Sequence, residues 1–365
     1  MVEKRAVRKQ QDTSRLGGQA SAGGPSQLAK VGAAKAVEDR LAHLRPIADA
    51  INVDVAQCVQ DADPGAVHRA RTGSRRLQAT LEAMLRETGA GRNALQQPAR
   101  AWLQQLKRVR RAAGPVRDLD VHRNLLENWI GKRAPKQDAT NVDGAGPAVT
   151  SDADSEASLL RSQAEKLDAW LKGERKRLAQ GMQKQIRKRQ QALAERQSEF
   201  FAVAGRVHRG RSKALRPADA VALEDFMRAS DAMPLLYAEN LHDFRKATKK
   251  ARYVAESGEA KRSSSSVAKA LKRIQDAIGV WHDWLCLAKE ATAALGQDAP
   301  ELTASFEHEV DRQFAAAMKT TQNMRGRLEG EWLAAARGGK ALSQPPAKRP
   351  PAALAIDDRR LASGF

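Results

Sequence analysis

A basic histidine motif occurs twice in this chain, and this repetition limits the fold more strongly than any other feature. The first copy occupies residues 67–77 and the second occupies residues 241–251. Both have the pattern apolar-His-x-x-Arg-x-x-x-basic-basic-apolar, which places His68 and His242 at equivalent positions. The spacing of three and four residues between basic positions predicts that each copy lies along one face of a helix.

A second motif follows each copy of the first. Residues 106–108 read Leu-Lys-Arg and lead to Gly114-x-x-x-Asp118, while residues 271–273 repeat Leu-Lys-Arg and lead to Gly279-x-x-x-Asp283. The lysine precedes the glycine by seven positions in both cases. Two linked motifs in the same order indicate an internal duplication.

The hydrophobic periodicity of the chain is helical. Apolar residues recur at helix spacing from Leu41 to Ile51, and we find no alternating β pattern of useful length. Asp63-Pro64 predicts a cap and the first residue of a helix, and Gly114-Pro115 predicts a helix end. Further helix starts are predicted at Pro98, Pro217, Pro234 and Pro300. The sequence therefore predicts an all-α protein made of two repeated antiparallel helical bundles.

Changes in composition divide the chain into five segments. We expect a disordered basic arm over residues 1–35, a first helical repeat over 36–133, a flexible linker over 134–155, a second helical repeat over 156–337 and a disordered Pro-rich tail over 338–365. Within the second repeat, residues 156–204 read as one long helix and residues 263–266 as a polar turn.

Each histidine motif presents a stripe of cations. At about 100° per residue, four side chains of the second copy fall within an arc of roughly 80° that is about 15 Å long: His242, Arg245, Lys249 and Arg252. The first copy presents the shorter stripe His68, Arg71 and Arg75, which ends at the neutral Gln78. Neither stripe contains an acid, so its cations repel one another by a few tenths of a kcal/mol per pair unless an anion lies against them.

The net charge also points to a polyanionic partner. The chain has 63 Lys and Arg against 43 Asp and Glu, a formal net charge of +20 and a pI of ≈ 10.3. This balance is typical of proteins that bind nucleic acid, polyphosphate or an anionic surface. Aromatic residues make up only 4% of the chain, which disfavours a reader of single strands that stacks bases on aromatic rings. A phosphate polymer without bases requires only a row of Lys and Arg.

The two linked motifs resemble those of the CHAD family, the conserved histidine α-helical domain. The resemblance covers roughly residues 36–330 and departs at Gln78, where the family has a basic residue. It implies paired helical bundles around a basic cleft or pore, binding of inorganic polyphosphate and no catalytic activity. It also implies a cytoplasmic setting on polyphosphate granules. A scaffold on such granules is a compatible interpretation, in which the basic arm and the Pro-rich tail recruit granule-associated proteins.

We expect polyphosphate-binding side chains from both repeats. The first repeat supplies His68, Arg71, Arg75, Arg76, Lys107, Arg108 and Arg117. The second supplies His242, Arg245, Lys249, Lys250, Arg252, Lys272, Arg273 and His282. His68 and His242 would donate hydrogen bonds to phosphate oxygens, which predicts tighter binding near pH 6 than near pH 8.

The non-basic residues of the second motif have simpler interpretations. Gly114 and Gly279 read as helix terminators. Asp118 and Asp283 read as ion-pair partners or caps that orient basic side chains. A basic run on a single helix can also be an ordinary solvated face, and it is the matched second copy that favours a binding site.

Other classes of protein fit the sequence less well. His242-Asp243 and His282-Asp283 faintly resemble the dipeptides of metal-dependent phosphohydrolases, but neither dipeptide recurs in the first repeat. The sequence contains no P-loop and no Gly-x-Ser-x-Gly motif, so we predict a protein that is not an enzyme and needs no cofactor or metal. Nonspecific binding of DNA or RNA is the main alternative.

The sequence shows no apolar signal region and no stretch near ~18 apolar residues, so we expect no membrane contact. The cysteines, Cys58 and Cys286, lack metal-ligand spacing and are too few for a disulfide framework.

Overall fold

The computed structural model describes residues 25–87, 92–133, 152–207, 216–256 and 265–337. All regular structure within these ranges is helical, which confirms the predicted all-α class. The helices are α1 (Pro25–Gln60), α2 (Pro64–Glu87), α3 (Arg92–Arg133), α4 (Asp152–Arg187), α5 (Gln190–Val207), α6 (Ala218–Ala232), α7 (Ala238–Glu256), α8 (Ser266–Leu295) and α9 (Pro300–Arg337), with one turn of 3₁₀ helix, η3 (Gly296–Asp298), before α9. Most of the expected arm, linker and tail lies outside the described residues.

Several helix starts follow the local sequence as predicted. The Asp63 carboxylate accepts a hydrogen bond from the Ala66 backbone N–H at 2.6 Å, and Pro64 is the first residue of α2. Ser265, in the expected polar turn, caps α8 by accepting from the Ala268 N–H at 3.2 Å. Pro300 is the first residue of α9. Side-chain caps and N-terminal prolines therefore set these boundaries.

Other predicted boundaries are wrong because tertiary packing overrides local signals. Helix α3 runs through both Pro98 and Pro115, so neither the predicted start nor the predicted end holds. Val116, Leu119 and Leu126, beyond the predicted end, are all buried and continue the apolar face of the helix. Burial of this face offsets the local cost of a proline inside a helix.

The remaining differences concern helix lengths. Helix α1 begins at Pro25, inside the segment expected to be a disordered arm. The long helix predicted over 156–204 is divided into α4 and α5 by a break after Arg187. Helix α7 begins at Ala238, four residues after the predicted start at Pro234.

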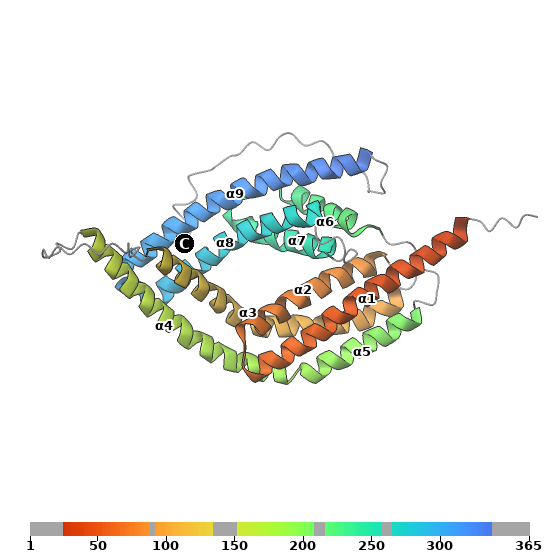
Figure 1. Ribbon diagram of the computed structural model, residues 1–365, viewed down its shortest axis with the longest axis horizontal. Coiled ribbons are helices and arrows are strands. Elements are labelled where there is room, and N and C mark those ends of the chain that lie inside the picture. Colours follow the sequence, from red (N-terminus) through yellow and green to blue (C-terminus); the bar gives the residue numbers. More distant parts are fainter. Residues whose placement is uncertain (1–24, 88–91, 134–151, 208–215, 257–264, 338–365) are drawn as a thin grey trace, which may run out of the picture.

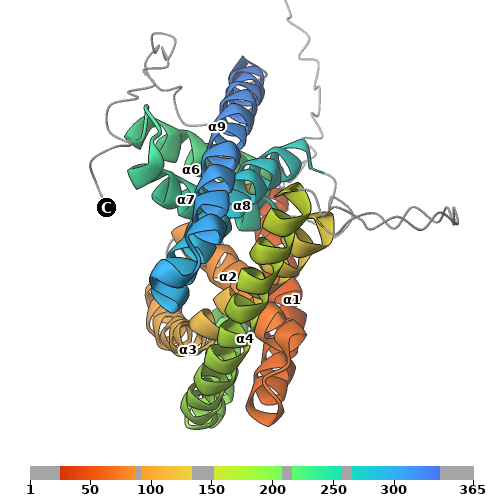
Figure 2. The same cartoon turned by 90° about the vertical axis from the view of Figure 1, so that its left-hand side faces the viewer.

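Three apolar clusters hold the helices together. The first joins α1, α2, the N-terminal half of α3, the C-terminal half of α4 and α5. The second joins α6 to α9 and includes Ala79 and Ala83 of α2. The third joins the other halves of α3 and α4 to the C-terminal part of α8 and the N-terminal part of α9. Figures 1 and 2 show the resulting shape, with α6–α9 on one side and α1–α5 on the other.

This packing places α2 of one group beside α7 of the other, at the border between the two groups of helices (Figure 1). These are the two helices that carry the histidine motifs. Helices α4 and α5, which follow the predicted linker, share their apolar contacts mainly with α1 and α3. The division of the chain into repeats at 134–155 stays a prediction from the sequence, and the packing groups the helices differently.

Candidate anion-binding site

The basic stripes of α2 and α7 form one group of charges. Lys249 of α7 lies within electrostatic reach of Arg71 and Arg75 of α2 and of Arg245 and Arg252 of its own helix. Burial, followed by repulsion from these four guanidinium groups, lowers the pKa of Lys249 to about 7. The packing of α2 on α7 therefore brings together cations that are far apart in the sequence. We call His68, Arg71, Arg75, Arg110, Arg117, Arg245 and Lys249 the cationic cluster.

The arginine of each histidine motif lies against the glycine of the second motif. Arg71 Nη1 donates to the carbonyl oxygens of Ala113 at 3.2 Å and of Gly114 at 2.5 Å. A Cβ atom at Gly114 would lie 3.2 Å from that nitrogen, and a Cβ atom at Gly279 would lie 2.9 Å from Arg245 Nη2. The expectation that these glycines end helices is wrong, because both lie inside helices where an arginine crosses.

Arg110 of α3 is a member of the cluster that sequence reasoning missed. Its guanidinium donates to the side-chain oxygen of Gln78 and to the Ser74 carbonyl, the latter at 3.3 Å. Burial, and next the charge of Arg75, lower the pKa of Arg110 to about 10. A guanidinium from α3 is thus hydrogen-bonded to Gln78, the position where the first stripe lacks its last cation.

The sequence does contain a signal for Arg110. Gln78 and Arg252 are each ten positions after a motif histidine, whereas Arg110 and Gln275 are each four positions before a motif glycine. The first half therefore has Gln then Arg at these two positions, and the second half has Arg then Gln. Comparing both positions at once, in place of the stripe alone, would have identified Arg110.

Three of the predicted binding residues form ion pairs with Glu82 or Glu256. Arg76 of α2 pairs with Glu256 of α7 at 3.2 Å, and Lys250 of α7 pairs with Glu82 of α2 at 2.5 Å. Arg252 also pairs with Glu256, at 3.5 Å, and its guanidinium lies 4.7 Å from the ring centroid of Tyr253. The ion pairs of Arg76 and Lys250 connect α2 to α7, and Arg252 pairs with Glu256 within α7. The three cations therefore have a structural role at the border of the cluster.

The centre of the cluster has no such compensation. Among the described residues, no ion pair or hydrogen bond is formed by Arg75, Arg245 or Lys249, and Arg245 Nε is buried without a partner. Arg71 has a single ion pair, with Asp118 at 3.4 Å, as expected for that aspartate. Partly buried cations without counter-charges are unfavourable unless an anion neutralises them.

The histidines divide into two kinds. The rings of His242 and His282 stack with centroids 4.6 Å apart and an interplanar angle of 26°. A hydrogen bond with Asp283, followed by one with Cys286, raises the pKa of His282 to about 9. Burial lowers the pKa of both His68 and His242, and neighbouring positive charges lower it further. These directions favour the neutral state of His68 and His242 at neutral pH, whereas Lys249, with a pKa of about 7, changes its charge there.

The structure does not bring every predicted residue into the cluster. Arg117 contributes to it, since its charge acts on His68 and Arg71. Four side chains taken from the second motif are exposed on α3 and α8, and among the described residues none of them forms a hydrogen bond or ion pair with the cluster: Lys107, Arg108, Lys272 and Arg273. Lys272 forms an ion pair with Asp276 on its own helix.

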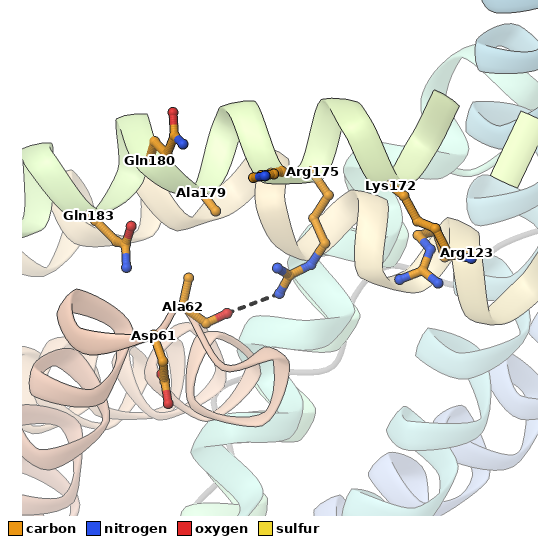
Figure 3. A pocket seen from close by; sticks show the side chains of 9 residues that line it. Asp61, Ala62, Arg123, Lys172, Arg175, Ala179, Gln180 and Gln183 are labelled. Carbon is orange, nitrogen blue, oxygen red and sulfur yellow. Dashed lines mark hydrogen bonds between the residues drawn. The ribbon is translucent and has the colours of Figure 1, made fainter. Parts of the chain in front are cut away.

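A separate pocket of ≈ 250 Å³ lies between the turn that joins α1 to α2 and the middle of α4 (Figure 3). Its basic lining includes Arg123, Lys172 and Arg175. Asp168 pairs with Arg123 at 3.0 Å and with Lys172 at 2.6 Å. Arg175 pairs with Asp120 and donates to the Ala62 carbonyl at 3.0 Å. Because these cations have partners within the protein, the pocket is a weaker candidate for anion binding than the cationic cluster.

Within the described residues, no group of three or more His, Cys, Asp or Glu side chains could hold a metal ion. No helix of this part of the chain combines the length and apolar character that crossing a bilayer requires.

Comparisons with known proteins agree with the fold and the motifs. A solved structure, the crystal structure of the CHAD domain from the plant Ricinus communis, matches with a TM-score of 0.50 and 18% sequence identity, over 79% of this chain and 91% of that chain. At this identity the likeness concerns the fold. No curated protein matches the chain. The sequence model of the CHAD domain matches residues 42–292, which is more than half of the chain, and the protein therefore belongs to the CHAD family.

Proposed function

We propose that this protein binds inorganic polyphosphate along the cationic cluster and performs no chemistry on it. The observation that carries the proposal is the set of uncompensated cations held between α2 and α7, with Arg75, Arg245 and Lys249 at its centre. Each half of the chain contributes to this set. Membership of the CHAD family supports the same ligand.

The shape and composition of the cluster favour a linear phosphate polymer. The cations follow the length of two neighbouring helices, so successive phosphates of one chain would contact successive side chains. Five of the six tryptophans are buried in the apolar clusters, and Trp170 on α4 is partly exposed. The buried tryptophans therefore provide no platform for stacking bases in the described part of the cluster, and nucleic acid would gain little from them beyond its phosphate contacts.

Affinity on such a surface comes from many modest contacts. Each exchange of a solvated cation for a phosphate contact contributes on the order of 1 kcal/mol in a watery groove. Released counterions make binding strongly dependent on salt. Binding also relieves the repulsion among Arg71, Arg75 and Lys249. We include cytoplasmic association with polyphosphate granules and their proteins in the proposal, as the setting in which this ligand is concentrated.

A salt-controlled competition tests the proposal. The protein is loaded with labelled long-chain polyphosphate at physiological salt, and duplex DNA or single-stranded RNA is added at matched phosphate concentration. The double variant Arg245→Ala/Lys249→Ala removes two cations from the cluster. Lys184→Ala/Arg187→Ala removes the same two types of charge from exposed positions near the end of α4 and serves as the control.

The outcomes separate the proposal from its alternative. We expect nucleic acid to displace polyphosphate poorly, and the cluster variant to lose affinity at least tenfold while the control stays within about twofold. Helicity measured by circular dichroism should be unchanged in both variants. Equal displacement by DNA or RNA, or equal losses in the two variants, would show a generic polycation and favour a nucleic-acid partner.

A further inference from the structure

Cys286 of α8 lies beside two histidines, each supported by its own carboxylate. Its sulfur is 3.7 Å from Nδ1 of His282, which is also 3.7 Å from Asp283. His122 reaches the same thiol from α3, and its Nδ1 is 2.7 Å from the Glu290 carboxylate. His122 is almost completely buried, with 3% of its surface exposed, while Cys286 is only partly buried. The polyphosphate contacts proposed above make no use of Cys286, His122 or Glu290.

This arrangement favours the thiolate. Burial alone would raise the pKa of Cys286, but hydrogen bonds with His122 and His282 lower it to about 7. Burial lowers the pKa of His122, yet hydrogen bonds with Cys286 and Glu290 raise it to about 9. At neutral pH a substantial fraction of the protein therefore has a negative sulfur beside positively charged imidazoles. The thiolate is the nucleophilic form of cysteine.

The other cysteine provides an internal contrast. Cys58 of α1 is fully buried, and burial, followed by the negative charge of Asp54, raises its pKa to about 12. It has no histidine among the groups that act on it. Its surroundings are those of an unreactive structural thiol.

We propose that Cys286 is an oxidant-sensitive modification site whose substrate is a small hydroperoxide such as hydrogen peroxide. The thiolate sulfur attacks one peroxide oxygen, an S–O bond forms and the O–O bond breaks. The sulfur is oxidised to sulfenic acid and the peroxide is reduced. The leaving hydroxide takes a proton from the imidazolium of His282 or His122 and departs as water.

Alkylation of the folded protein tests the site without any ligand. Iodoacetamide is applied over pH 5.5–9.5, and mass spectrometry measures the rate at each cysteine. We expect Cys286 to react with a midpoint near pH 7 and Cys58 to stay unmodified until the protein is unfolded in denaturant. His122→Gln should move the Cys286 midpoint above pH 8. A wild-type midpoint near pH 9, or equal rates at the two cysteines, would overturn the proposal.

Peroxide treatment tests the chemistry directly. Stoichiometric hydrogen peroxide, followed by dimedone, should label Cys286 and leave Cys58 unlabelled; absence of the Cys286 adduct would refute the oxidation step. Cys286→Ser should form no adduct at this position and serves as the matched control.

Discussion

Lys249 should make polyphosphate binding depend on pH between 6 and 8. Its pKa in the free protein is about 7, because burial and the surrounding guanidinium groups disfavour the charged form. A bound phosphate chain would restore the charge and bring the pKa back toward the ordinary value of about 10.5. Because the pKa of Lys249 is lowered in the free protein, the affinity for polyphosphate is greatest below pH 7 and falls as the pH rises through 7.

The size of the effect follows from the fraction of free protein in which Lys249 is already protonated. With a pKa of about 7, that fraction is about 90% at pH 6 and about 10% at pH 8. Affinity should therefore fall about tenfold between pH 6 and pH 8, and each binding event at pH 8 should take up about one proton.

Calorimetric titration in buffers of different ionisation enthalpy measures both quantities. Lys249→Arg keeps a charge that does not titrate, so its affinity should change by less than about twofold over the same range. Lys184→Arg, at an exposed position of α4, should keep the tenfold dependence. A wild-type protein that binds equally well at pH 6 and pH 8, or a Lys249→Arg variant that keeps the full dependence, would refute this reasoning.

Four further substitutions probe the same geometry. Gly279→Ala should displace the Arg245 guanidinium, whose Nη2 lies 2.9 Å from the new Cβ, and lower affinity about fivefold, whereas Gly173→Ala on α4 meets nothing within 4 Å and should leave binding unchanged in a parallel titration. Arg75→Ala should reduce the slope of log affinity against log salt by about one, and an unchanged slope would exclude this side chain from phosphate contact. Glu256→Gln releases Arg76 and Arg252 from their ion pairs, so it should tighten binding about threefold at low salt and cost about 1 kcal/mol in the free energy of unfolding measured with urea. Lys249→Met removes a buried charge whose pKa is depressed on folding, so it should raise the free energy of unfolding by about 2 kcal/mol at pH 7 while weakening binding; a destabilised variant would contradict the assigned environment.

Local signals predicted the helices but not all of their ends. The cap formed by Asp63 and the proline at the start of α9 were identified from a few neighbouring residues. The course of α3 through Pro115 could not be, because it depends on burial against helices that are far away in the sequence. Boundaries set by tertiary packing are not encoded in a short window.

The candidate site was predictable in part for a similar reason. The stripe on each helix follows from periodicity, and it identified Arg71, Arg75, Arg245 and Lys249 as members. Which cations remain without a counter-charge depends on acids from the other helix, such as Glu82 and Glu256. Periodicity on one helix does not reveal which residues of the other helix it meets. The ion pairs of Arg76 with Glu256 and of Lys250 with Glu82 could therefore not be predicted.

The facing stripes of α2 and α7 have a consequence for how the protein is assembled. Like charges at this border push the two groups of helices apart, and the ion pairs of Glu82 and Glu256 oppose them. A bound polyphosphate chain would cancel that repulsion and stabilise the association of the two groups of helices. A chain severed between α5 and α6 should then reassemble more tightly when polyphosphate is present, so the ligand would serve as a template for its own receptor.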